Sequence, residues 1–203
     1  MLANSPLHKQ NKPKSDCDLQ SIFSLCFSEY FNAQLQGNAL EPLYTPANAK
    51  QTANTIFYRH DYFSSALHEI AHWCIAGNKR REQIDYGYWY APDGRTAQQQ
   101  NDFELVERKP QALEWAFSIA CNIPFRVSID NLNAQDDDEE ASADQEHKFT
   151  QAVNRQLTQY VKQGFPARAS IFLTQLHSFY STQPLSANDE RLSVAALHSG
   201  KTL

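Results

Sequence analysis

Residues 64–78 read SSALHEIAHWCIAGN, a largely apolar stretch with two histidines four residues apart. Its apolar residues surround most of a helix, and Gly77 supplies a stop. A helix that is apolar around most of its circumference is buried, so we predict a buried helix over about 64–76. Positions four residues apart share one helix face, so the imidazoles of His68 and His72 lie side by side.

Two neighbouring imidazoles on a buried helix predict a metal site. Their ring nitrogens need partners, and histidine suits zinc and ferrous iron alike. A pair of core histidines satisfied by other side chains is the alternative. The longer zinc-protease pattern would require glycine at Ile75 and histidine at Asn78, so the sequence departs from it. Of the other histidines, His60 is the reserve ligand, because it follows a predicted strand.

The third ligand is expected to be a carboxylate from the next long helix. Polar residues recur there at spacings of three, four and three, which places Glu104, Glu107, Gln111 and Glu114 on one rough stripe. Glu107 is the first choice among these carboxylates, followed by Glu104 and then Glu114.

The remaining periodicity predicts a mixed α/β (α+β) fold, mostly helical, with a small mixed sheet that carries the metal-binding helix. Strands are expected at 55–59 and 125–129, and a strand or rigid loop at 86–90. Helices are expected at 19–36, where Gly37 and Asn38 supply the stop, at 146–163 and at 168–182. A further helix is expected to begin at Thr96. Pro110 either interrupts this helix or starts a second one that runs through Cys121. Residues 41–54 are expected to be a connection.

The chain is expected to form one domain, 16–183, between a disordered N-terminal tail, 1–15, and a C-terminal tail, 184–203. Within that domain, 133–145 is rich in aspartate and glutamate and is expected to be a mobile acidic linker.

The net charge of −5 discourages non-specific nucleic-acid binding, which requires clustered basic residues. One short basic cluster, at 79–81, is followed at once by Glu82. The sequence shows no signal peptide and no apolar run of membrane-spanning length, so a cytoplasmic location without membrane or direct nucleic-acid contact is expected. Its cysteines lack the spacing of a zinc ribbon, which favours buried reduced thiols.

Several strings in the chain resemble the elongation factor P hydroxylase family. They are HEIAHWCIAG at 68–77, DYGYWY at 85–90, PDGR at 92–95, and Val106-Glu107 leading into KPQAL at 109–113. The likeness runs from about Leu19 to Tyr180. It implies a hydroxylase that adds a hydroxyl group to the β-lysylated lysine of elongation factor P. It also implies a fold like that of a small metal-dependent ribonuclease, and a two-histidine, one-carboxylate site formed by His68, His72 and a glutamate, foremost Glu107.

Such a three-ligand site leaves positions open for dioxygen and substrate, and hydroxylation of an unactivated C–H bond requires a redox-active metal. We therefore expect a non-haem Fe(II) oxidoreductase of monooxygenase type with dioxygen as co-substrate. Asp85, Asp93 and Glu104 are candidates for binding the cationic substrate. Tyr88, in the aromatic run, is a candidate for lining its channel.

Two other functions also fit the residues of the histidine helix. In a zinc peptidase of the HExxH type, Glu69 would be the base that activates water, whereas in a hydroxylase it would orient substrate or ligand. A non-catalytic adaptor for a translation factor would hold a purely structural metal, but structural zinc usually has four protein ligands.

Overall fold

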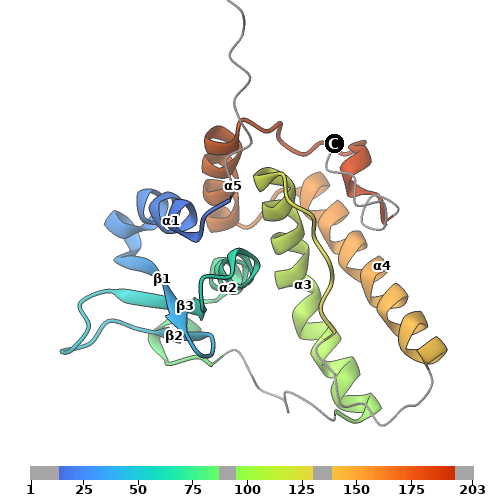
Figure 1. Cartoon of the computed structure of the whole chain (residues 1–203), viewed down its shortest axis with the longest axis horizontal. Coiled ribbons are helices and arrows are strands. Elements are labelled where there is room, and N and C mark those ends of the chain that lie inside the picture. The colour runs from blue at the N-terminus through green and yellow to red at the C-terminus, as the bar shows by residue number, and fades with distance from the viewer. Residues whose placement is uncertain (1–13, 87–94, 130–138, 195–203) are drawn as a thin grey trace, which may run out of the picture.

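The computed structural model describes residues 14–86, 95–129 and 139–194 (Figure 1). Its elements are α1 Asp16–Phe31, β1 Ala33–Ala39, β2 Leu43–Thr45, β3 Asn54–Arg59, α2 Phe63–Ile75, α3 Ala97–Cys121, α4 Glu139–Gln163 and α5 Ala167–Tyr180, with short 3-10 turns η1 Arg80–Glu82 and η2 Glu190–Leu192. The predicted class, a mostly helical fold with a small mixed sheet, is confirmed.

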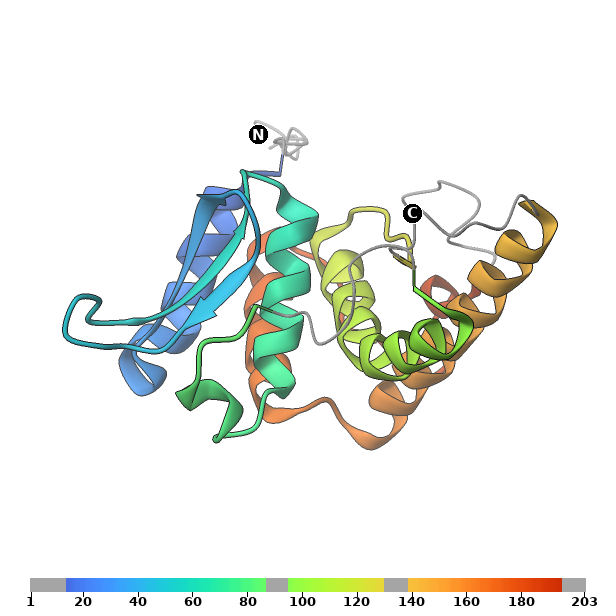
Figure 2. The same ribbon diagram turned by 90° about the horizontal axis from the view of Figure 1, so that it is seen from below.

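The sheet has the strand order β1-β3-β2, with β1 parallel and β2 antiparallel to the central strand β3. Along β1 buried and exposed residues alternate, as expected of a strand with one face in the core. The buried face packs against α1 and α2, and α2 lies between the sheet and α3 (Figures 1 and 2). The helix that carries both histidines is therefore central.

The first predicted helix was too long, and strand β1 was missed. Helix α1 ends at Phe31, because Asn32 adopts a left-handed conformation (φ 45°) that closes the helix. Gly37, taken as a helix stop, lies inside β1. A Cβ atom there would meet the Tyr58 hydroxyl oxygen at 2.7 Å, so glycine is required by the close approach of β3. Part of the predicted connection at 41–54 is strand β2.

Aromatic side chains fix α2 against its neighbours. Trp73 packs on Phe23 and Phe27 of α1, with ring centroids 5.3 and 4.8 Å apart. Phe172 of α5 contacts both of these phenylalanines. The guanidinium of Arg168 donates to the carbonyl oxygens of Trp73 (2.9 Å) and Ala76 (2.5 Å) at the end of α2. The aromatic contacts of Trp73 and the hydrogen bonds from Arg168 therefore hold α2 in place.

Helix α3 runs unbroken through Pro110, which corrects the predicted interruption. A proline costs one backbone hydrogen bond, but here its ring is buried in the packed middle of a 25-residue helix. The predicted cap is confirmed: Thr96 and Gln99 form a capping box. Helix α4 packs along α3 and begins at Glu139, so the second half of the predicted linker, 139–145, is helical.

Residues 123–129 form no strand, contrary to prediction. The alternation that suggested one is real, since Phe125 and Val127 are buried and Arg126 is exposed. The backbone bonds to a side chain instead of a neighbouring strand: the Gln111 amide nitrogen donates to the Ser128 carbonyl (2.8 Å), and the Ser128 N–H donates to the Gln111 amide oxygen (3.0 Å). The strand or loop predicted at 86–90 lies outside the described residues from position 87 onward.

None of the helices in the described part of the chain is both long and apolar enough to cross a membrane.

Candidate metal centre

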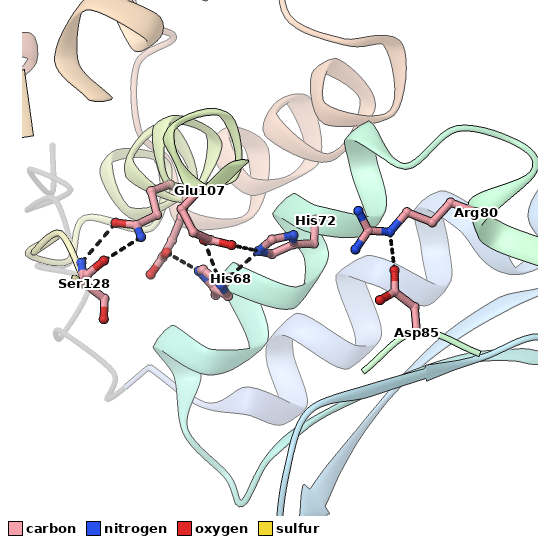
Figure 3. Close-up of polar contacts among 8 residues, drawn as sticks. His68, His72, Arg80, Asp85, Glu107 and Ser128 are labelled. Atoms are coloured by element: carbon pink, nitrogen blue, oxygen red, sulfur yellow. Dashed lines mark hydrogen bonds and ion pairs between the residues drawn. The ribbon is translucent and has the colours of Figure 1, made fainter. Parts of the chain in front are cut away.

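Three side chains from α2 and α3 converge on one point (Figure 3). The Nε2 atoms of His68 and His72 lie 3.1 Å apart. Glu107 of α3 places Oε1 3.2 Å from the His72 nitrogen and Oε2 3.6 Å from the His68 nitrogen. These ligand atoms all lie within 4.8 Å of one another, so they could hold a metal ion. Glu107 is buried, while the two imidazoles are partly exposed.

A second glutamate of α3 fixes the orientation of one imidazole. Glu114 Oε2 lies 2.8 Å from His68 Nδ1, and a carboxylate can only accept, so Nδ1 carries the proton. In the neutral ring Nε2 then presents its lone pair to the point shared with His72 and Glu107. A carboxylate behind a histidine ligand is the usual support of metal-binding imidazoles.

The electrostatics of the centre favour positive charge. Burial by itself lowers the pKa of His68, but the hydrogen bond to Glu114 and the charges of the neighbouring glutamates outweigh it and raise the pKa to about 10. Burial raises the pKa of Glu69, and the two histidines offset part of that rise. The carboxylates that stabilise the protonated imidazole would also stabilise a metal cation, which binds in place of the proton.

The centre lines a cavity of about 290 Å³, which we call the main cavity. The side chains of the centre belong to the more buried part of the lining, which we call the floor. The lining residues of the main cavity are Pro42, Arg59, Tyr62, Ser64, Ser65, His68, Glu69, His72, Tyr86, Phe103, Glu107, Glu114, Arg126 and Ser128. The volume is near the lower end for small-molecule sites and suits a single extended side chain.

A second cavity, of about 40 Å³, touches the other side of His72 and Glu69, and we call it the minor cavity. Asp85, a predicted substrate residue, lines it rather than the main cavity. Its carboxylate forms an ion pair with Arg80 (Figure 3). Its backbone pairs with Tyr44. The fold thus ties Asp85 to the protein itself.

The other predicted site residues are distributed as follows. Glu104 points toward α4, where Gln145 donates to its carboxylate at 2.8 Å, and it lines neither cavity. His60 stacks edge-on against Tyr62. Tyr88 and Asp93 lie outside the described residues. The expected order of α3 carboxylates therefore changes: Glu107 converges with the histidines, and Glu114 supports one of them.

Sequence reasoning missed the cationic residues of the main cavity, Arg59 and Arg126, and also Ser128. They come from the end of β3 and from the irregular segment after α3. No spacing links positions so far apart in the chain, so only the tertiary contacts reveal them.

A family model described as elongation factor P hydroxylase matches residues 22–190. The chain belongs to this family. A relative from Haemophilus influenzae, named elongation factor P lysine hydroxylase, is 45% identical over 166 residues, which cover 82% of this chain and 89% of that protein. The match to the hydroxylase family includes α2, α3 and every described residue of the candidate centre, so the resemblance seen in the sequence strings is confirmed.

Proposed function

We propose that this protein hydroxylates elongation factor P on its β-lysylated lysine, with a non-haem ferrous ion and dioxygen. The observation that carries the proposal is the convergence of His68, His72 and Glu107 at the floor of the main cavity. The name of the 45% identical relative supports elongation factor P as the substrate and lysine as the modified residue. Since translation factors work in the cytoplasm, the protein is expected there as well.

The donor set fits ferrous iron. Two neutral imidazoles and one carboxylate form the ligand set of non-haem iron oxygenases and leave coordination positions for dioxygen and substrate. Bound in this way, the iron would supply the redox chemistry that a C–H hydroxylation requires and that zinc lacks. Among the described residues, no further side chain joins this group as a fourth ligand, which disfavours a purely structural metal.

The protein's own groups hold and orient the reactants. Glu114 keeps the Nδ1 proton of His68 in place, so that Nε2 faces the ligand point. Tyr62, Tyr86 and Phe103 wall the main cavity and give the methylenes of a lysyl side chain an apolar surface.

Glu69 also lines this cavity without belonging to the ligand group. It lies one residue from His68, about 100° around the helix, so its carboxylate is placed to receive an ammonium group of the substrate. We assign it this orienting role.

The test uses the whole protein loaded with ferrous iron under oxygen and β-lysylated elongation factor P as substrate. Intact-protein mass spectrometry should show one added oxygen atom, which isotopically labelled dioxygen should supply. The His68→Ala variant should give no product, and the Glu104→Ala variant should retain activity. Peptide cleavage by the zinc-loaded protein without any oxygen requirement would contradict the proposal and favour a peptidase.

A further inference from the structure

The mouth of the main cavity has a different chemical character from its floor. The floor carries three glutamates, Glu69, Glu107 and Glu114. The exposed part of the lining, which forms the mouth, carries two arginines and two tyrosines. We call these four residues the rim: Arg59, Tyr62, Tyr86 and Arg126. The lining residues are thus anionic inside and cationic outside, although the chain as a whole has a net charge of −5.

The rim side chains are available to a partner. The exposed fractions are 53% for Tyr62, 60% for Tyr86 and 84% for the side chain of Arg126, and Arg59 is also exposed. Arg126 lies 3.5 Å from Glu146 of α4, but a pair this open to water is weak and exchanges readily. Tyrosine and arginine are among the residues that contribute most binding energy at protein interfaces.

The arginines stand on backbone that is already ordered. Arg126 belongs to the irregular segment whose neighbours Phe125 and Val127 are buried, and Phe125 stacks on Trp115 with ring centroids 5.5 Å apart. The two hydrogen bonds between Gln111 and Ser128 hold the same segment to α3. Alternating burial leaves Arg126 directed outward, next to the cavity.

The tight turn between β3 and α2 orders the other side of the rim. Tyr62 N–H donates to the Arg59 carbonyl (3.2 Å), and the Tyr62 ring packs edge-on against His60, whose backbone has φ of 50°. Asp61 of this turn is exposed but does not line the cavity. Because the backbone that carries these side chains is ordered before any partner arrives, binding would cost the ordering of the side chains alone.

We propose that the rim docks an acidic surface of the protein substrate, next to the lysine whose extended side chain enters the cavity. This inference rests on the proposed function and adds the part of the enzyme that recognises the folded substrate. A cationic side chain alone would be attracted to the glutamates and repelled by Arg59 and Arg126. A cationic side chain surrounded by carboxylates complements both the glutamates of the floor and the arginines of the rim. This match favours one partner and one orientation over others.

The test compares two ligands, β-lysylated elongation factor P and a short peptide that spans the modified lysine. Fluorescence anisotropy measures Kd for each ligand over a range of salt concentrations. The rim variant is Arg59→Ala combined with Arg126→Ala. Its control, Arg155→Ala with Lys162→Ala, removes two exposed positive charges from α4 that line neither cavity. Circular dichroism checks that both variants fold.

The rim variant should bind the whole protein about tenfold more weakly and lose most of the salt dependence, because rim charges act mainly through electrostatic attraction. Its Kd for the peptide should not rise, since the acidic surface is missing there and the removed arginines repel the cationic side chain. The control variant should match the wild-type protein. Tyr62→Ala should also weaken binding to the whole protein, whereas Tyr30→Ala, on the exposed side of α1, should not.

The inference is overturned if the rim variant binds the whole protein as tightly as wild type, if the control loses as much affinity, or if the peptide loses as much as the protein. Any of these results leaves hydroxylation by the wild-type protein intact, and with it the proposed function. A wild-type protein that neither binds nor hydroxylates elongation factor P overturns both proposals.

Discussion

The two cavities meet at His72 and Glu69 but differ in how their charges are balanced. In the minor cavity the carboxylate of Asp85 faces the guanidinium of Arg80, so opposite charges of the protein satisfy each other. In the main cavity Glu69, Glu107 and Glu114 lie around the two histidines, and the raised pKa of His68 gives these three carboxylates one protonated imidazole to face. In the minor cavity Asp85 has a cationic partner from the protein, whereas the carboxylates around the two histidines of the main cavity could bind a metal cation.

The two cavities therefore differ in role: the charged residues of the minor cavity hold segments of the fold together, and those of the main cavity are placed to bind a ligand. The ion pair of the minor cavity joins Arg80 of η1 to Asp85, whose backbone pairs with Tyr44 of β2. It therefore links the segment that follows α2 to the sheet. The main cavity instead gathers ligand atoms from α2 and α3, two helices held together by the core. Substitutions in the two places should therefore affect different measurements.

The largest effect is expected for loss of a ligand. His72→Ala and Glu107→Ala should each abolish iron binding and hydroxylation, because the two remaining donors cannot hold the ion. Elemental analysis of the purified protein, together with the mass of elongation factor P, checks both. Glu104→Ala is the matched control, since that carboxylate faces α4. Full iron content in Glu107→Ala would assign the third ligand elsewhere.

A smaller loss is expected for Glu114→Gln, which keeps the shape but removes the charge behind His68. Iron affinity should fall by about ten- to a hundredfold, as for other carboxylates that support histidine ligands. Titration with ferrous iron under anaerobic conditions measures it, with Glu104→Gln as the control. An unchanged affinity would mean that Glu114 does not support the ligand.

Glu69→Gln should keep the iron and lose only part of the turnover. Glu69 stands beside the ligand group, so its removal should raise KM for the β-lysylated substrate more than it lowers kcat. Steady-state kinetics with a mass-spectrometric readout separates the two parameters. Complete loss of turnover with bound metal and an unchanged Kd for the substrate would show that Glu69 is an indispensable acid or base, as in a peptidase.

The smallest effect on activity is expected on the other side of His72. Asp85→Asn should cost about 1 kcal/mol of unfolding free energy, because the pair with Arg80 is partly open to water. Iron content and KM should stay near wild-type values. Chemical denaturation and the same kinetic assay measure the two properties, and a large rise in KM would return Asp85 to the substrate site.

The sequence alone determined which histidines share one helix face. Spacing of four on an apolar helix placed His68 and His72 on one face, because helix geometry is local and repeats every 3.6 residues. The same periodicity put Glu107 and Glu114 on one stripe of α3 and identified the class of fold. It ordered the glutamates with Glu107 first, and Glu107 is the one that converges with the histidines. It placed Glu104 before Glu114, however, because Glu104 shares their stripe and only the packing of α4 turns it away.

Elements whose partners are remote in the chain depended on tertiary structure. Strand β1 has a sequence, AQLQGNA, that continues a helical pattern, and it becomes a strand because β3 pairs with it and Tyr58 fills the space above Gly37. Residues 125–129 alternate like a strand, yet the backbone of Ser128 bonds to the side chain of Gln111 and not to a neighbouring strand. A local pattern records which side of a segment is buried, but not what covers it.

The rim shows the same division. Arginine at 59 and at 126 carries no local signal, because exposed arginines occur on most surfaces. The two become one feature only when β3 and the segment after α3 border the same cavity. The sequence determined which residues can bind a metal, since helical spacing needs no other part of the chain. Packing decided which glutamates lie beside the two histidines and which charges surround the cavity, since both depend on contacts between distant segments.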